Sequence, residues 1–163
     1  MTKIGFIGAG QMAQALARGF VGAEKIAEAD ISYSDPSLAA IDAFRQRIPG
    51  AQLCSAPQEL VESTDVIFLA VKPQHLDSVF SRIEERWDVL FVSIAAGVPL
   101  ERLYYGCKSS RVMRVMPNTP CLVNAGAIAY CLGDATTKDD VAVVDELLNA
   151  VGVAHEVPES LMD

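Results

Sequence analysis

Basic residues are scarce in this sequence. Its 163 residues include 13 Lys and Arg against 21 Asp and Glu, which gives a formal net charge of -8. Nucleic acids and anionic membrane surfaces are bound by clustered Lys and Arg, so this balance disfavours both as partners. A small anionic ligand is still allowed, because backbone N–H groups at the start of a helix can bind it without a formal charge.

Patterns of metal ligands are also missing. No two cysteines form a C-x-x-C pair, and the only histidines are His75 and His155. Zinc sites usually have closer ligand spacing, so we expect no metal. We interpret the cysteines as buried or half-buried thiols. They are Cys54, Cys107, Cys121 and Cys131.

Long apolar runs and targeting segments are absent from the sequence. No run approaches the roughly 20 residues that a transmembrane helix needs. The first residues lead directly into a strand pattern, with no sign of a signal peptide. We therefore expect a cytoplasmic protein.

The apolar residues that are present, 51% of the chain, are enough for the core of one domain. Apolar runs predict strands at residues 3–8, 31–34, 52–54, 65–71, 89–94, 111–116, 127–132 and 153–157. Helical spacing predicts helices between most of them, including one at residues 76–87. Ser55 with Gln58, and Thr137 with Asp140, resemble the caps that begin two of these helices. The alternation predicts an α/β fold with a doubly wound, mostly parallel sheet covered by helices on both faces.

A glycine-rich turn follows the first predicted strand. Gly8, Gly10 and Ala13 match the pattern G-x-G-x-x-[G/A], which is typical of a Rossmann-type NAD(P)-binding domain when it lies between a strand and a helix. Gly8 permits the tight turn, and Gly10 lets a pyrophosphate approach the backbone. Free N–H groups at the helix start would then face the phosphates. The alternative is a glycine turn that binds nothing.

Asp35 follows the second predicted strand, about 20 residues beyond the turn, where the ribose of a dinucleotide is usually bound. A carboxylate there accepts hydrogen bonds from the ribose 2′-OH and repels a 2′-phosphate, so Asp35 favours NAD. No Arg or Lys lies between Lys25 and Arg45 to bind a phosphate. Asp35 could instead cap the helix that begins near Pro36. Ser34 and Ser37 could still donate hydrogen bonds to a 2′-phosphate.

Three loops follow later strands at the edge of the sheet where doubly wound domains bind ligands. Residues 70–73 (AVKP) include Lys72, which is either a cation beside the crevice or a solvated surface residue. Residues 93–97 (SIAAG) are small enough for a ring or ribose to lie against the backbone. Residues 116–120 (MPNTP) contain two prolines that stiffen the loop, with Asn118 and Thr119 available for hydrogen bonds.

Four motifs in this order, GAGQMA, AVKP, SIAAGV and MPNTP, resemble those of pyrroline-5-carboxylate reductase, and the match extends over nearly the whole chain. The resemblance implies an enzyme that transfers hydride from NAD(P)H to 1-pyrroline-5-carboxylate, giving L-proline in the last step of its biosynthesis. The family usually takes NADPH. Its members often carry a small polar residue in place of Asp35, and some carry Asn in place of Pro57.

The resemblance also implies which residues bind. The coenzyme-binding residues are Ile7, Gly8, Ala9, Gly10, Gln11, Met12, Ser34, Asp35, Pro36, Ala70, Val71, Lys72, Pro73, Ala95, Ala96 and Gly97. The residues on the substrate side are Met116, Pro117, Asn118 and Thr119. No residue is assigned as catalytic. The coenzyme carries the chemistry in such enzymes, and neither histidine stands out as the proton donor.

The resemblance further implies that residues 1–163 are one dinucleotide-binding domain. In the family, a helical domain for dimerisation and substrate binding follows this point, and it is absent from this chain. We expect the chain alone to bind a dinucleotide with little reductase activity, and the parent enzyme to be a homodimer or larger. Two alternatives stay open: a relative of 3-hydroxyacid dehydrogenases or imine reductases, and a non-catalytic NAD(P)-binding module.

Overall fold

An eight-stranded sheet forms the centre of the computed structural model, which describes residues 2–84 and 88–162. The strand order is β3-β2-β1-β4-β5-β6-β7-β8. The strands are β1 (Ile4–Ile7), β2 (Ile31–Ser34), β3 (Gln52–Leu53), β4 (Val66–Leu69), β5 (Leu90–Ser93), β6 (Val112–Met116), β7 (Gly126–Leu132) and β8 (Gly152–Glu156). This order, which runs outward in both directions from β1, confirms the doubly wound α/β fold.

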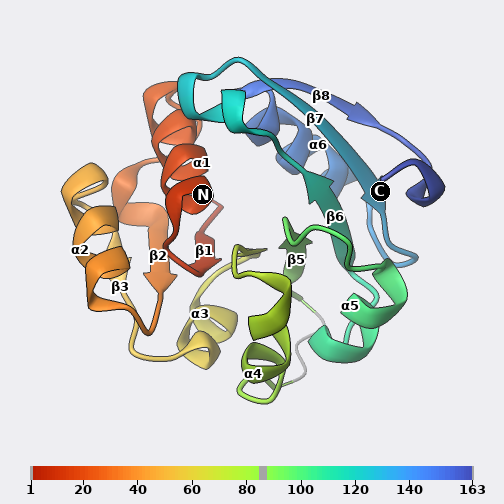
Figure 1. Cartoon of the computed structure of the whole chain (residues 1–163), viewed down its shortest axis with the longest axis horizontal. Coiled ribbons are helices and arrows are strands. Elements are labelled where there is room, and N and C mark those ends of the chain that lie inside the picture. The colour runs from red at the N-terminus through yellow and green to blue at the C-terminus, as the bar shows by residue number, and fades with distance from the viewer. Residues whose placement is uncertain (1, 85–87, 163) are drawn as a thin grey trace.

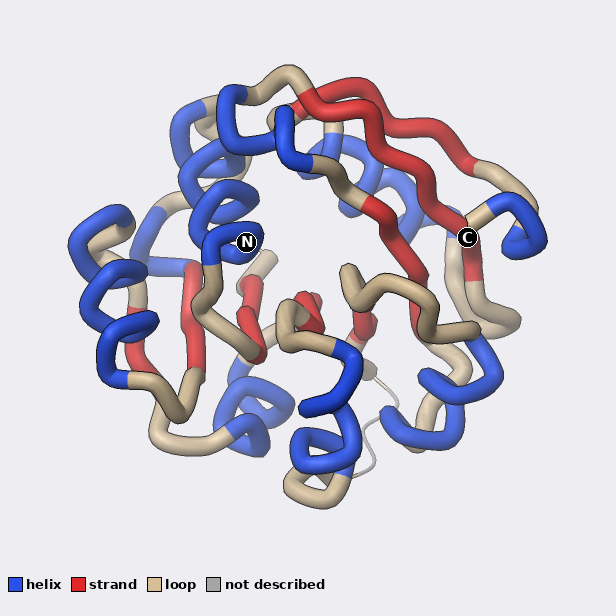
Figure 2. Tube along the Cα trace, viewed as in Figure 1, coloured by secondary structure: helices blue, strands red, loops and turns tan. Residues whose placement is uncertain are grey.

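Helices cover both faces of this sheet (Figure 1). The α-helices are α1 (Gln11–Gly22), α2 (Leu38–Arg47), α3 (Pro57–Ser63), α4 (Leu76–Phe80), α5 (Leu100–Cys107) and α6 (Lys138–Leu148). Short 3-10 turns are η1 (Glu28–Asp30), η2 (Pro73–His75), η3 (Thr119–Val123) and η4 (Glu159–Leu161). Figure 2 shows the strands lying between two groups of helices.

Alternate residues of each central strand enter different cores. In β4, Phe68 packs in the core beneath α1, α2 and α6, whereas Ile67 and Leu69 pack beneath α3, α4 and α5. The rings of Phe68 and Phe6 lie 5.1 Å apart in the first core. A strand buried on both faces must be apolar at every position, which explains the unbroken run at residues 66–69.

One strand pair departs from the parallel arrangement. β7 pairs with β6 in the antiparallel direction, and β8 then pairs with β7 in parallel. Only η3 connects β6 to β7. A parallel pair needs a crossover of a dozen or more residues, whereas an antiparallel pair can be joined by a short connection. The sheet is therefore mostly parallel, as predicted.

Two local predictions are corrected by the structure. The helix predicted over residues 76–87 ends as α4 at Phe80, and Trp87 lies outside the described residues. The capping box predicted for Ser55 and Gln58 is wrong, because the N-cap of α3 is Ala56. Ser55 bonds instead to the carboxylate of Glu59, one position further along. The capping box of Thr137 and Asp140 is confirmed at the start of α6.

Candidate dinucleotide-binding site

The glycine turn joins β1 to α1 at the carboxyl edge of the sheet. Gly8 has φ of +102°, and a Cβ there would lie 2.6 Å from the carbonyl oxygen of Ala70. Gly8 is therefore required for the fold itself. At Gly10, the N-cap of α1, a Cβ would meet nothing within 4 Å. Gly10 is therefore dispensable for packing, and its bare backbone lies open to a ligand.

Several main-chain amides of this turn are free to bind an anion. The N–H of Gly8 donates to the carbonyl of Ser34 at 2.8 Å, and the first helical bond is donated by Gln14 to Gly10. Among the described residues, the N–H groups of Gly10, Gln11 and Met12 have no acceptor. These amides lie at the positive end of the helix dipole, where an anion is stabilised.

Two side chains hold the turn in place. Gln14, which is buried, donates from Nε2 to the carbonyl of Ala9 at 2.8 Å. Asp35 accepts the N–H of Ala9 at Oδ2 and the N–H of Ser37 at Oδ1, both at 2.8 Å. The N-cap of α2 is Ser37, whose hydroxyl accepts from Ala40 N, so Asp35 is not the cap of that helix. Asp35 links the glycine turn to the start of α2.

A cavity of about 280 Å³ lies beside the turn. Its wall includes six of the predicted coenzyme residues, which are Ile7, Gly8, Ser34, Asp35, Pro36 and Val71. Small-molecule pockets usually span about 300–1,000 Å³, so this cavity has room for part of a dinucleotide. The position beyond β2, where the ribose is bound in such domains, identifies it as the candidate adenosine subsite.

The remaining lining residues are not among the predicted coenzyme residues, although the resemblance had drawn attention to position 57. They are Ser55, Pro57, His75, Ser78, Val79 and Arg82. His75 ends η2, Val79 lies in α4 and Arg82 follows α4, and the three recur at the helical spacing i, i+4, i+7. This spacing, directly after the AVKP loop, is the signal that could have identified them.

Of the other predicted coenzyme loops, residues 70–73 line this cavity through Val71 alone, and residues 95–97 do not line it. The N–H of Ala70 donates to the carbonyl of Ile7 at 2.8 Å, which holds the loop after β4 against the glycine turn. Lys72 is exposed, and Pro73 begins η2. After β5, Ala95 is buried, whereas Ala96 and Gly97 are exposed.

The predicted substrate-side residues run from the end of β6, at Met116, to the start of η3, at Thr119. The side-chain oxygen of Asn118 accepts the N–H of Ala127 at 3.1 Å and lies 3.8 Å from the sulfur of Cys121. Asn118 thus fixes η3 against β7 with this oxygen, and its amide nitrogen remains available. Met116 is half-buried, and Thr119 is exposed.

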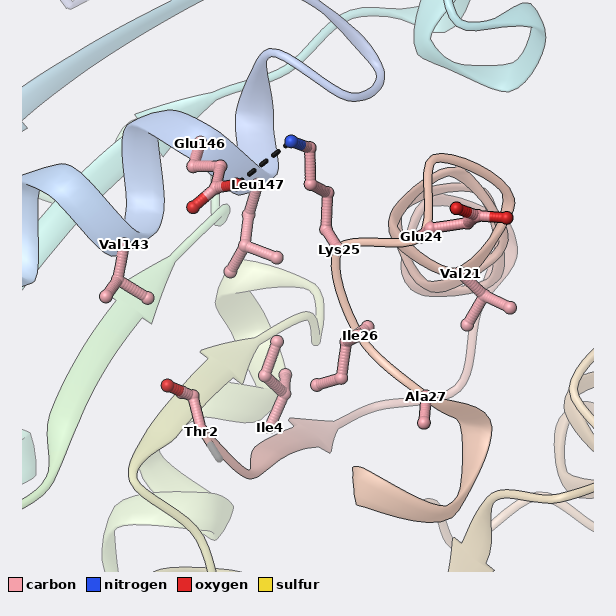
Figure 3. Close-up of a pocket in the computed structure, with 10 residues that line it drawn as sticks. All are labelled: Thr2, Ile4, Val21, Glu24, Lys25, Ile26, Ala27, Val143, Glu146 and Leu147. Carbon is pink, nitrogen blue, oxygen red and sulfur yellow. Dashed lines mark hydrogen bonds and ion pairs between the residues drawn. The ribbon is translucent and has the colours of Figure 1, made fainter.

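A larger cavity, of about 660 Å³, lies at the opposite end of β1 (Figure 3). Ile4 lines it together with residues of α6 and of the segment after α1, and an ion pair of 2.9 Å joins Lys25 to Glu146 there. None of the predicted coenzyme or substrate residues lines this cavity. Its position at the amino edge of the sheet separates it from the glycine turn.

The cysteines and the possible metal ligands are the remaining candidate groups. The four cysteines are buried thiols, and burial raises the pKa of Cys107 to about 12. Within residues 2–84 and 88–162, no group of three or more His, Cys, Asp or Glu residues could hold a metal ion. The helices of this part of the chain include none that is long and apolar enough to cross a membrane.

The sheet order and the glycine turn together define a Rossmann-type dinucleotide-binding domain. Residues 3–97 match the sequence model of the family described as NADP oxidoreductase, coenzyme F420-dependent, and the chain belongs to that family. The chain is also 38% identical to a pyrroline-5-carboxylate reductase of Methanosarcina acetivorans, in an alignment that covers 99% of this chain and 60% of the relative. The resemblance seen in the motifs is thereby confirmed.

Solved structures agree with this relationship. A pyrroline carboxylate reductase of Plasmodium falciparum with NADP bound superposes with a TM-score of 0.83 at 32% identity, covering 97% of this chain and 58% of that one. A pyrroline-5-carboxylate reductase of Coxiella burnetii gives 0.87 at 27% identity, covering 96% and 59%. The chain therefore spans somewhat more than half the length of these relatives.

Proposed function

We propose that this chain is the coenzyme-binding domain of a pyrroline-5-carboxylate reductase and that it binds NADP(H) or NAD(H). The observation that carries the proposal is the open glycine turn. A Cβ at Gly10 would meet no atom within 4 Å, and the main-chain N–H groups that follow have no acceptor among the described residues. The relatives named as such reductases, one of them with NADP bound, support the same assignment.

The turn would hold the pyrophosphate through the amides of Gly10, Gln11 and Met12. The adenosine half would occupy the cavity between Pro36 and the α4 face, where apolar groups of Val71 and Val79 can contact a purine ring. The loops at residues 70–73 and 95–97 would border the nicotinamide ribose. Residues 116–119 would border the nicotinamide and the substrate.

When bound, the coenzyme supplies the hydride that reduces the C=N bond of 1-pyrroline-5-carboxylate. The domain's own task is orientation, because hydride transfer requires donor and acceptor about 3–3.5 Å apart with aligned orbitals. We propose that a further helical region of the parent enzyme completes the substrate pocket and forms a homodimer or larger assembly. We assign no residue of this chain as the proton donor.

Calorimetric titration of the chain with NADPH and NADH tests the binding proposal. We expect saturable binding of at least one coenzyme, with one molecule per chain. Absence of binding by both at millimolar concentration would refute it.

A second assay, with 1-pyrroline-5-carboxylate and NADPH, tests whether the chain binds the coenzyme without forming a complete substrate pocket. We expect coenzyme binding with negligible turnover by these 163 residues. Sustained L-proline formation by the chain alone would show that it holds a complete substrate pocket.

A further inference from the structure

One arginine lines the candidate adenosine subsite. Arg82 follows α4, and it shares the cavity wall with Ser34 and Asp35 although it is distant from them in sequence. Arg45, Arg102 and Arg111 each form an ion pair, with Asp42, Asp77 and Asp140 respectively. Across residues 2–84 and 88–162, the side chain of Arg82 has no such partner and no hydrogen bond. Its guanidinium is available to a ligand in the cavity.

The position of Arg82 matters because the sequence near Asp35 offers no cation for a 2′-phosphate. The segment after β2 contains no cation, and its carboxylate, Asp35, would repel a 2′-phosphate. Both carboxylate oxygens of Asp35, however, already accept main-chain N–H groups, from Ala9 and Ser37. These bonds fix the carboxylate beside the glycine turn. The fold brings a cation, Arg82, to the cavity that Asp35 also lines.

Ser34 adds a neutral donor to this arrangement. Ser34 is only 7% exposed, yet it lines the cavity. Its carbonyl accepts the N–H of Gly8, whereas its hydroxyl has no hydrogen bond among the described residues. An arginine fork and a hydroxyl are groups that bind a phosphate well, because the guanidinium can form parallel N–H···O bonds to two oxygens.

We propose that Arg82, together with the hydroxyl of Ser34, binds the 2′-phosphate of NADP(H) and offsets the repulsion from Asp35. This inference rests on the proposed function, since it concerns the adenosine half of the same dinucleotide. It makes Arg82 a specificity-determining residue: its loss weakens coenzymes that carry the 2′-phosphate and spares those that lack it.

The experiment compares wild type with Arg82→Gln in titrations of four probes: NADPH, NADH, 2′,5′-ADP and 5′-AMP. Arg47→Gln is the matched control, because Arg47 is exposed at the end of α2, does not line the cavity and carries the same charge. For Arg82→Gln we expect about tenfold weaker binding of NADPH and 2′,5′-ADP, which is the lower end of the range for hydrogen bonds to charged groups. NADH and 5′-AMP should change by less than about twofold. Arg47→Gln should leave all four unchanged.

Other results separate failure of this inference from failure of the proposed function. Equal weakening of all four probes by Arg82→Gln would place the arginine on the adenine or on the 5′-phosphate, and no weakening would place it outside the site. Either result overturns the inference while coenzyme binding itself stands. A wild-type chain that is folded by circular dichroism but binds none of the probes would instead reject the proposed function.

Discussion

Asp35→Asn separates the structural role of this carboxylate from its effect on the coenzyme. Asp35 receives N–H bonds of 2.8 Å from Ala9 and from Ser37. The substituted amide has one oxygen in place of two, so it can keep one bond and must lose the other. A hydrogen bond to a charged group contributes about 1.5–3 kcal/mol, and partial exposure reduces this value. We expect a loss of about 1 kcal/mol in the free energy of unfolding.

Urea unfolding at pH 7, followed by circular dichroism, measures this loss. Asp42→Asn is the control, because Asp42 is exposed and lies 3.5 Å from Arg45 in a surface ion pair, which contributes less than about 1 kcal/mol. If Asp35→Asn unfolds with the same free energy as wild type, the carboxylate does not hold the glycine turn.

The same variant tests the effect of Asp35 on coenzyme choice. Removing its charge should raise affinity for NADPH relative to NADH, because the repulsion of the 2′-phosphate disappears. Titration of both coenzymes measures the ratio. An unchanged NADPH affinity would show that Asp35 does not oppose the 2′-phosphate.

Two further variants test the account through stability. Gly8→Ala places a Cβ 2.6 Å from the carbonyl oxygen of Ala70 at φ of +102°, so urea unfolding should show a loss of about 2–4 kcal/mol; a loss below about 1 kcal/mol would contradict the strained turn. Asp140→Asn removes the charge and one of the two oxygens that accept bonds from Arg111, of 2.6 and 3.0 Å, and should cost about 2 kcal/mol at pH 7, whereas the exposed Asp139→Asn should cost little. Burial alone would raise the pKa of Asp140, but bonds from Arg111 and Thr137 outweigh it and lower this pKa below its usual value. The stability from Asp140 is therefore complete above about pH 4, the unfolded value, and is lost as the pH falls through the lower folded pKa. The difference between Asp140→Asn and wild type should shrink in acid, and a difference that persists unchanged at pH 2 would contradict the ion pair as its source.

The strands were the most predictable part of the fold. The strand predicted at residues 31–34 coincides with β2, because the flanking Asp30 and Asp35 cannot continue a buried strand. The antiparallel direction of β7 could not be predicted from the sequence. It depends on the path of the chain through η3 and not on the apolar pattern within the strand. Similarly, the pattern up to Trp87 did not reveal that α4 ends at Phe80.

Only part of the candidate site was predictable from the sequence. The turn at Gly8 and Gly10 follows a motif whose residues are close in sequence, so local chemistry identified it. Arg82 lines the same cavity as Ser34 and Asp35, and one sequence does not display this proximity between distant segments. The bond from Ala9 to Asp35 is of the same kind. Sequence spacing predicted a ribose beside Asp35, whereas the structure shows the contact of Asp35 with the turn.

Titration of NADPH into Gly10→Ala tests the glycine turn most directly. A Cβ at Gly10 meets no atom within 4 Å, and its φ of -70° suits any residue, so the variant should fold with nearly wild-type stability. The added methyl group would occupy the space of the pyrophosphate, and we expect affinity for NADPH to fall at least about 100-fold, or about 2.7 kcal/mol. Gly22→Ala, equally open but at the far end of α1, should bind as wild type does. Gly10→Ala that binds NADPH as tightly as wild type would contradict the pyrophosphate site at this turn.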